Sequence, residues 1–178
     1  MNGLSPRRSI TLAVHPTSAG FGWTAFEAPF APFDWGLVYF ERDKNAQCLR
    51  RLEKLLNRLG PEMFVLEAFE QDDSARADRI TKLCRAMVSL AAHKGADVAV
   101  HRRADVQACF ASVGATTRYD IAEAVARNID ALRHKLPPRR RSWEKEDPRL
   151  ALFSAAALTI THYTLSSSRL LDDLREAA

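Results

Sequence analysis

The order of strand and helix patterns is the feature that most constrains the fold of this 178-residue chain. Three strand patterns precede the first helix pattern, which predicts an antiparallel meander, and helix and strand patterns then alternate, which is typical of parallel strands. The sequence therefore predicts an α/β fold with a mixed, five-stranded sheet flanked by helices. The predicted strands cover residues 9–14, 22–27, 34–41, 62–67 and 97–101, and the predicted helices cover residues 44–59, 74–94, 118–135 and about 148–166.

This order of elements is that of the ribonuclease H-like fold, in which the first strand lies at the centre of the sheet and the fourth strand lies beside it. His15 and Glu67 stand at the ends of these two strands, so we expect their side chains to be neighbours. Such a layout usually has a carboxylate at the end of the first strand. One interpretation is that His15 hydrogen-bonds to Glu67 and connects the two strand ends without a metal. The other is that Glu67 is simply solvated.

The length of the chain suits one domain with a substantial core. We expect this domain to span residues 9–166, with tails at residues 1–8 and 167–178 and a basic insertion loop at residues 136–147. The last helix is expected to start near Pro148, because Asp147 is a good N-cap residue and proline is favoured at the first helical position.

Composition excludes some classes of protein. No apolar run approaches the ~20 residues that a membrane helix needs, and the N-terminus lacks a secretory signal pattern, so we expect a cytoplasmic protein. The three cysteines form no CxxC pair, which favours reduced thiols over a structural zinc site. The formal charge of +4 and the pI near 9.2 favour an anionic partner without deciding the question.

Several short motifs resemble those of RuvC, the Holliday-junction resolvase family, across residues 10–163. That family ends its first strand in Asp-Pro-Gly-Ser followed by Gly-Tyr-Gly, ends its fourth strand in Ile-Glu, begins the next helix with Ala-Asp-Ser-Ala and has Ala-Ile-Ala-Ile-Thr-His in its last helix. The corresponding segments here are His15-Pro16-Thr17-Ser18 with Gly22-Trp23-Thr24, Leu66-Glu67, Asp73-Ser74-Ala75 and Ala157-Leu158-Thr159-Ile160-Thr161-His162.

The resemblance implies a nuclease that cuts four-way DNA junctions with two Mg²⁺ ions bound by four acidic side chains. Hard cations prefer oxygen ligands, and two of them stabilise both the attacking and the leaving oxygen of a phosphodiester. However, the four acidic positions of the family correspond here to His15, Glu67, Ala151 and Ser154. Glu67 is therefore the one acidic ligand that is retained. A neutral imidazole is a poor ligand for Mg²⁺. We therefore expect a pseudo-nuclease that needs no cofactor to bind DNA.

The alternative is an active endonuclease with a relocated site. Asp147, Ala151 and Ser154 lie on one face of the predicted last helix, and Asp147 is one turn nearer its start. A site built from His15, Glu67 and Asp147 could then bind Mg²⁺ or Mn²⁺, provided that the helix is shifted by a turn. Otherwise Asp147 is only the helix cap.

The resemblance also identifies candidate DNA contacts. Two lysines that the family places near the scissile phosphate fall on Gln107 and Arg118. A cation at a helix start is unfavourable to the helix dipole, and that cost favours a phosphate-binding role for Arg118 over a structural one. Arg102 and Arg103 follow a strand end. Phe69 lies one position from where the family has an aromatic that enters the junction, although a surface loop residue is an equal interpretation.

The segment from Arg133 to Lys145 breaks a helix pattern with two prolines and carries six Lys or Arg residues and Trp143. It has no good counterpart in the family. Guanidinium groups next to an indole suit phosphate contact with base stacking, whereas the simpler interpretation is a solvated loop. The candidate DNA-binding residues in this segment are Arg139, Arg140 and Arg141.

Dimerisation follows from the resemblance too, because the family forms a two-fold pair largely through the long helix after Glu67. The apolar face of residues 74–94 could pack on a second subunit or on its own sheet. We therefore expect a RuvC-like protein, a homodimer, that binds branched or structured DNA such as four-way junctions. Two further hypotheses stay open at this stage: an enzyme with an altered site, and a protein-interaction domain without DNA affinity.

Overall fold

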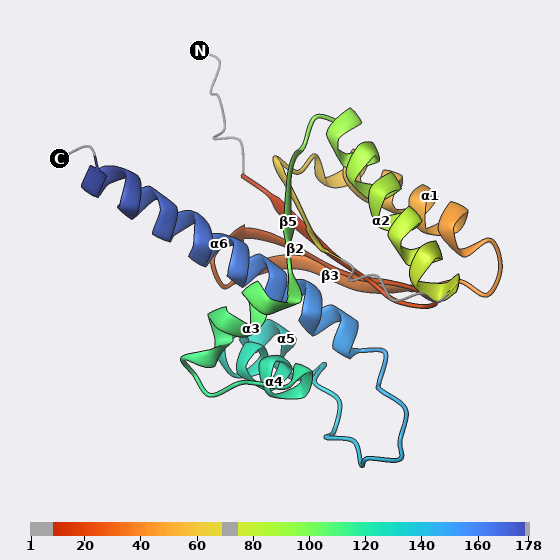
Figure 1. Ribbon diagram of the computed structural model, residues 1–178. Helices are drawn as coiled ribbons and strands as arrows, with labels where there is room; N and C mark the ends of the chain where they lie inside the picture. Colours follow the sequence, from red (N-terminus) through yellow and green to blue (C-terminus); the bar gives the residue numbers. More distant parts are fainter. Residues whose placement is uncertain (1–8, 69–74, 177–178) are drawn as a thin grey trace.

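The computed structural model describes residues 9–68 and 75–176, and a mixed five-stranded sheet forms its centre (Figure 1). The strand order is β3-β2-β1-β4-β5, with β1, β2 and β3 antiparallel and β4 and β5 parallel to β1. This confirms the predicted α/β sheet and the central place of the first strand. The strands are β1 (Thr11–Pro16), β2 (Gly20–Ala28), β3 (Ala31–Tyr39), β4 (Met63–Glu67) and β5 (Asp97–His101).

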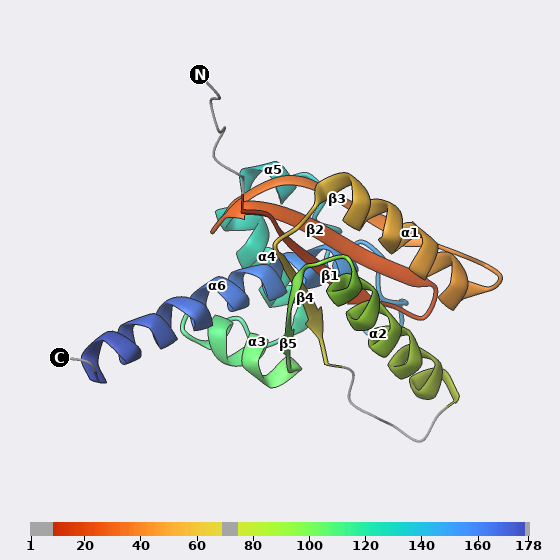
Figure 2. The same ribbon diagram turned by 90° about the horizontal axis from the view of Figure 1, so that it is seen from above.

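The helices cover both faces of the sheet (Figures 1 and 2). Leu12 and Val14 of β1 pack in a core with the first two helices, whereas Ala13 between them packs in a second core with the later helices. This alternation is the period of two that a strand imposes on its side chains. The first face carries α1 (Lys44–Leu59) and α2 (Ala75–His93), and the second carries α3 (Arg103–Ala111), α4 (Arg118–Asn128), α5 (Asp130–Arg133) and α6 (Leu150–Glu176).

The first turn of α6 lies very close to β2, and Gly22 makes this approach possible. A Cβ atom at Gly22 would lie 2.3 Å from the backbone carbon and oxygen of Ala151. Gly22 is also the register partner of His15 on β1. The beginning of α6 is therefore positioned directly beside the end of β1.

Three helix predictions differ from the structure. The helix α3 was not expected, because only Val106 and Phe110 of its side chains are buried and its apolar pattern is weak. The predicted helix over 118–135 is divided at Ile129, which adopts an extended conformation and buries its side chain in the core. Finally, α6 continues to Glu176, so the boundary expected at residue 167 falls inside a helix whose last turns are exposed.

The apolar face of α2 is packed within the chain. Leu83 and Met87 are fully buried in the core shared with α1 and the sheet. Cys48 and Cys84 are buried in the same core, and burial raises the pKa of both thiols to about 11. Among the described helices, none is both long enough and apolar enough to cross a bilayer.

Candidate functional site

His15 and Glu67 lie next to each other at the ends of β1 and β4, as the strand order predicted. The register pairs Val14 with Leu66, so the next residue on each strand points to the opposite face, the one that α4 and α6 cover. The Nδ1 atom of His15 lies 2.6 Å from Oε2 of Glu67, with 8% and 17% of the two side chains exposed. The contact is short, although Nδ1 of His15 has no hydrogen-bond partner of satisfactory geometry among the described residues.

Arg118, the first residue of α4, contacts the other side of the His15 ring. Its Nη2 atom lies 3.3 Å from Nε2 of His15. Because a guanidinium only donates, Nε2 must accept, and this assigns the ring proton to Nδ1, which faces Glu67. The Nη1 atom of Arg118 donates to Oε1 of Glu146 over 2.6 Å. Both nitrogens of the imidazole are therefore engaged by protein groups.

The surroundings keep Glu67 ionised. Burial by itself would raise the pKa of the Glu67 carboxyl, but the contact with His15 and the neighbouring charges, including those of Arg118 and Arg103, outweigh it, so the pKa lies below its ordinary value. The carboxylate is thus stabilised by cationic and polar groups of the chain itself.

His15 and Glu67 open into a cleft of about 470 Å³ between α2, the first turn of α6 and the start of α4. Three arginines line the cleft, together with the carboxylates of Glu67, Glu146 and Asp147. Arg103 and Arg118 also line two adjoining hollows, one of them about 530 Å³ in volume. The arginines of the cleft are Arg76, Arg103 and Arg118.

Asp147 lies on the cleft but is engaged elsewhere. Its carboxylate accepts from the backbone N–H of Arg149 at 2.9 Å and from the Nε and Nη2 atoms of the same arginine at 3.0 and 2.7 Å. The contact with the Arg149 side chain lowers the pKa of Asp147. These contacts form a turn just ahead of α6, which begins at Leu150, so the capping of that helix by Asp147 stays a prediction.

The chemistry of these residues does not fit a pair of Mg²⁺ ions. Within residues 9–68 and 75–176 no three His, Cys, Asp or Glu side chains gather into a group that could bind a metal. Ala151 lines the cleft and Ser154 lines the hollow beside Glu67, and neither offers a carboxylate. Two hard divalent cations would there meet the Glu67 carboxylate, the carboxylates of Glu146 and Asp147 that pair with arginines, and several guanidinium groups.

Comparison with known proteins gives a match in structure and none in sequence. No protein-family model and no curated protein matches the chain. T. thermophilus RuvC in complex with a Holliday junction substrate superposes with a TM-score of 0.66 at 15% identity, over 89% of this chain and 96% of that chain. A second structure of RuvC from Thermus thermophilus gives a TM-score of 0.62 at 19% identity with the same coverage.

The chain has the fold of RuvC. At 15% and 19% identity the superpositions establish a shared fold only. They support the resemblance in the motifs at the level of the fold. Glu67 ends β4 beside β1, as the Ile-Glu motif of the RuvC resemblance implied.

The structure places the other predicted site residues at different distances from the cleft. Arg103, the first residue of α3, lines all three hollows, whereas Arg102 before it pairs with Asp105 of the same helix. Arg139 and Arg140 line the hollow next to Arg118. Arg141 lies farther out, against Trp143. Phe69 lies outside the described residues.

Two charged residues of the cleft, Arg76 and Glu146, were not among the site residues predicted from the sequence. Arg76 of α2 precedes Ile80 and Cys84 by one and two helical turns, and all three line the cleft. That spacing of four residues was visible in the sequence. Glu146 pairs with Arg118 across 28 positions of sequence, and no local pattern predicts that contact.

A second histidine pair connects β5 to α6. The Nε2 atom of His101 lies 3.2 Å from Nδ1 of His162, and burial lowers the pKa of both rings. Both rings lie at contacts between regular elements, as a structural role requires.

Proposed function

We propose that this protein binds branched or structured DNA, four-way junctions included, through the arginine-lined cleft and the basic surface beside it, and that it does so without cutting the strands. The observation that carries the proposal is the cleft of a RuvC fold in which Arg103 and Arg118 surround a Glu67 carboxylate that His15 already contacts. Guanidinium groups are well suited to phosphate oxygens.

The positive charge is available to a ligand. The side chains of Arg76 and Arg103 make no hydrogen bond or ion pair with another described residue, although both line the cleft. The ion pair of Arg118 with Glu146 is partly exposed, with 33% and 41% of the side chains accessible, and such pairs contribute little free energy. A DNA phosphate can therefore compete with Glu146 for Arg118.

A comparison supports the choice of ligand. One of the similar structures is RuvC in complex with a Holliday junction substrate. In the proposal, phosphates of the DNA backbone lie where that fold has its acidic positions, and no metal is needed for binding. A homodimer, as the resemblance implies, remains part of the proposal, but the apolar face of α2 is already occupied by the core.

A second candidate function is cleavage by a relocated site. His15, Glu67 and Asp147 do line one cleft. For that function Asp147 would have to exchange Arg149 for a Mg²⁺ or Mn²⁺ ion, and Arg118 would have to leave His15. The contacts of both residues favour the binding function.

The exchange of Arg118 for alanine tests the proposal. We expect Arg118→Ala to weaken binding to a labelled four-way junction by about tenfold and to lower the slope of log Kd against log salt concentration by about 1, because one phosphate contact is lost. Glu146→Gln should have the opposite effect on affinity, since it frees Arg118. Binding is measured by fluorescence anisotropy over a range of salt concentrations.

Arg175→Ala is the matched control. This arginine is 79% exposed near the end of α6 and pairs with Asp172, far along the chain from the cleft. Its loss should change affinity by less than about twofold. Equal losses for Arg118→Ala and Arg175→Ala would mean that the cleft is not where the DNA binds.

A further inference from the structure

Trp143 does not line the cleft, so the proposed function gives it no role so far. It is 75% exposed, more than any other large apolar side chain in the described part of the chain. Burying an indole normally stabilises a fold, so an indole left in water at the surface is available for a partner.

The backbone around Trp143 is ordered by a tight turn. The N–H of Glu144 donates to the carbonyl of Arg141 at 3.0 Å, and the N–H of Arg141 donates to the Glu144 carboxylate at 2.8 Å. The guanidinium of Arg140 donates to the Glu144 carbonyl at 2.6 Å. Trp143 is the third residue of this turn, so its position is defined although its side chain is exposed.

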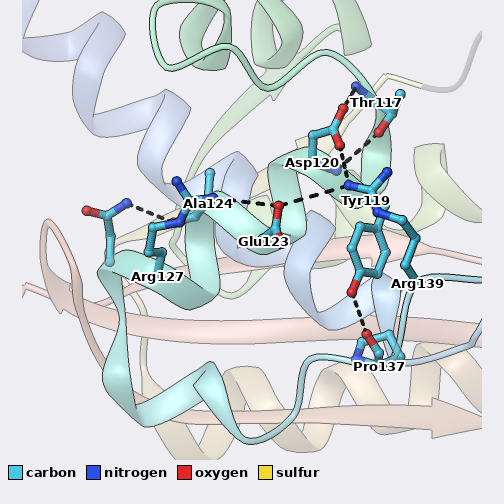
Figure 3. A network of polar contacts seen from close by, with 9 residues as sticks. Thr117, Tyr119, Asp120, Glu123, Ala124, Arg127, Pro137 and Arg139 are labelled. Carbon is cyan, nitrogen blue, oxygen red and sulfur yellow. Dashed lines mark hydrogen bonds and ion pairs between the residues drawn. The ribbon is translucent and has the colours of Figure 1, made fainter.

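The basic insertion loop (residues 136–147) is connected to α4 on both sides of the turn. Before the turn, Arg139 donates to Asp120 at 2.8 Å and lies 4.6 Å from the ring centre of Tyr119, whose hydroxyl donates to the Pro137 carbonyl at 2.8 Å (Figure 3). After the turn, Glu146 pairs with Arg118. The interpretation as a merely solvated loop does not account for these contacts.

The chemistry next to the indole is cationic. The guanidinium carbon of Arg141 lies 5.5 Å from the centre of the Trp143 ring. The acidic side chains of the loop are engaged within the chain: Glu144 accepts from the turn, Glu146 from Arg118 and Asp147 from Arg149. A ring with a guanidinium beside it and no apolar neighbour in residues 139–147 matches a flat, anionic ligand better than an apolar protein surface.

We propose that Trp143 stacks on an unpaired nucleobase of DNA. The inference rests on the proposed function, because the backbone of the same DNA would follow the hollow lined by Arg118, Arg139 and Arg140. Stacking on an aromatic side chain needs a base that is not enclosed in a duplex, so the ligand class is single-stranded DNA or a junction with unpaired nucleotides.

The test compares Trp143→Ala with Trp143→Phe on two DNA molecules: a single-stranded oligothymidylate and a fully paired duplex of equal length. Trp143→Ala should weaken binding to the single strand by about tenfold and leave duplex binding within about twofold, with an unchanged salt slope, because no charge is lost. Trp143→Phe keeps a stacking ring and should retain most of the affinity. Val113→Ala, which removes another exposed apolar side chain (64% exposed), is the control.

Fluorescence supplies a second readout. Of the three tryptophans, Trp23 is 3% exposed and Trp35 is partly buried against the core, so quenching of tryptophan emission by the single strand should come largely from Trp143 and should be strongly reduced in Trp143→Phe. If wild type binds the junction but Trp143→Ala binds the single strand as wild type does, the stacking inference is wrong and the proposed function stands. If the wild type binds neither of these two molecules nor the labelled four-way junction of the Arg118 test, the proposed function fails. Equal losses on duplex and single strand would mean that the indole contacts something other than a base.

Discussion

Replacing His15 by alanine is expected to lower the free energy of unfolding by about 3 kcal/mol at pH 7. The variant would leave the Glu67 carboxylate, 17% exposed, without its nearest partner and would open a small cavity at the end of β1. Removing one member of a buried pair typically costs 3–5 kcal/mol, and the lower value applies because Arg118 and Arg103 still lie near the carboxylate. Denaturant unfolding followed by circular dichroism measures the loss.

The pH dependence follows from the lowered pKa of Glu67. A carboxyl whose pKa is lower in the folded state than its ordinary value of 4.5 contributes stability that is fully present above pH 4.5 and is lost as the pH falls through the folded value. The difference between wild type and His15→Ala should therefore shrink on acidification below pH 4.5. His15→Asn places an amide donor near the former position of Nδ1 and should recover part of the stability that His15→Ala loses. A difference that does not change with pH would contradict the role of His15 in stabilising the ionised Glu67 carboxylate.

Gly22→Ala is expected to have an effect of similar size, about 3 kcal/mol, for a steric reason. The new methyl group would lie 2.3 Å from the backbone of Ala151, and backbone atoms cannot rotate away as a side chain can. The first turn of α6 must then move away from β2. Because Ala151 lines the cleft, the affinity for DNA should fall together with the stability.

Gly60→Ala is the control that separates this clash from the loss of a glycine as such. Gly60 has a φ of +54°, and a Cβ atom there would meet nothing within 4 Å, so the expected cost is backbone strain of about 1 kcal/mol with unchanged DNA affinity. If the two alanine variants lose the same stability, the close approach of α6 to β2 is not what Gly22 provides.

Much of the architecture could be predicted because its signals are local. The alternation of Leu12, Ala13 and Val14 between two faces requires a strand with helices on both sides, and the order of patterns then placed β4 beside β1. The wrong predictions concern features that local sequence patterns do not encode. The break at Ile129 depends on tertiary burial, and the exposed end of α6 has no apolar pattern against the core that a sequence could reveal.

The site was predictable only in part. The strand ends placed His15 beside Glu67, and the pattern at the predicted helix start singled out Asp147, which lines the cleft. The network that decides their chemistry depends on long-range contacts, namely Arg118 to His15 across 103 positions and Glu146 to Arg118 across 28. Periodicity carries no information on such contacts, so the engagement of both ring nitrogens of His15 appears only in the fold.

In the proposed function, the arginines of the cleft bind DNA and no metal-dependent cleavage takes place there. A labelled four-way junction incubated with the protein in EDTA, in Mg²⁺ and in Mn²⁺ at matched ionic strength tests it most directly, with bound and nicked DNA scored in the same samples. We predict equal binding in all three conditions and no nicked strand. Metal-dependent nicking by the wild type that Glu67→Gln abolishes would contradict the account.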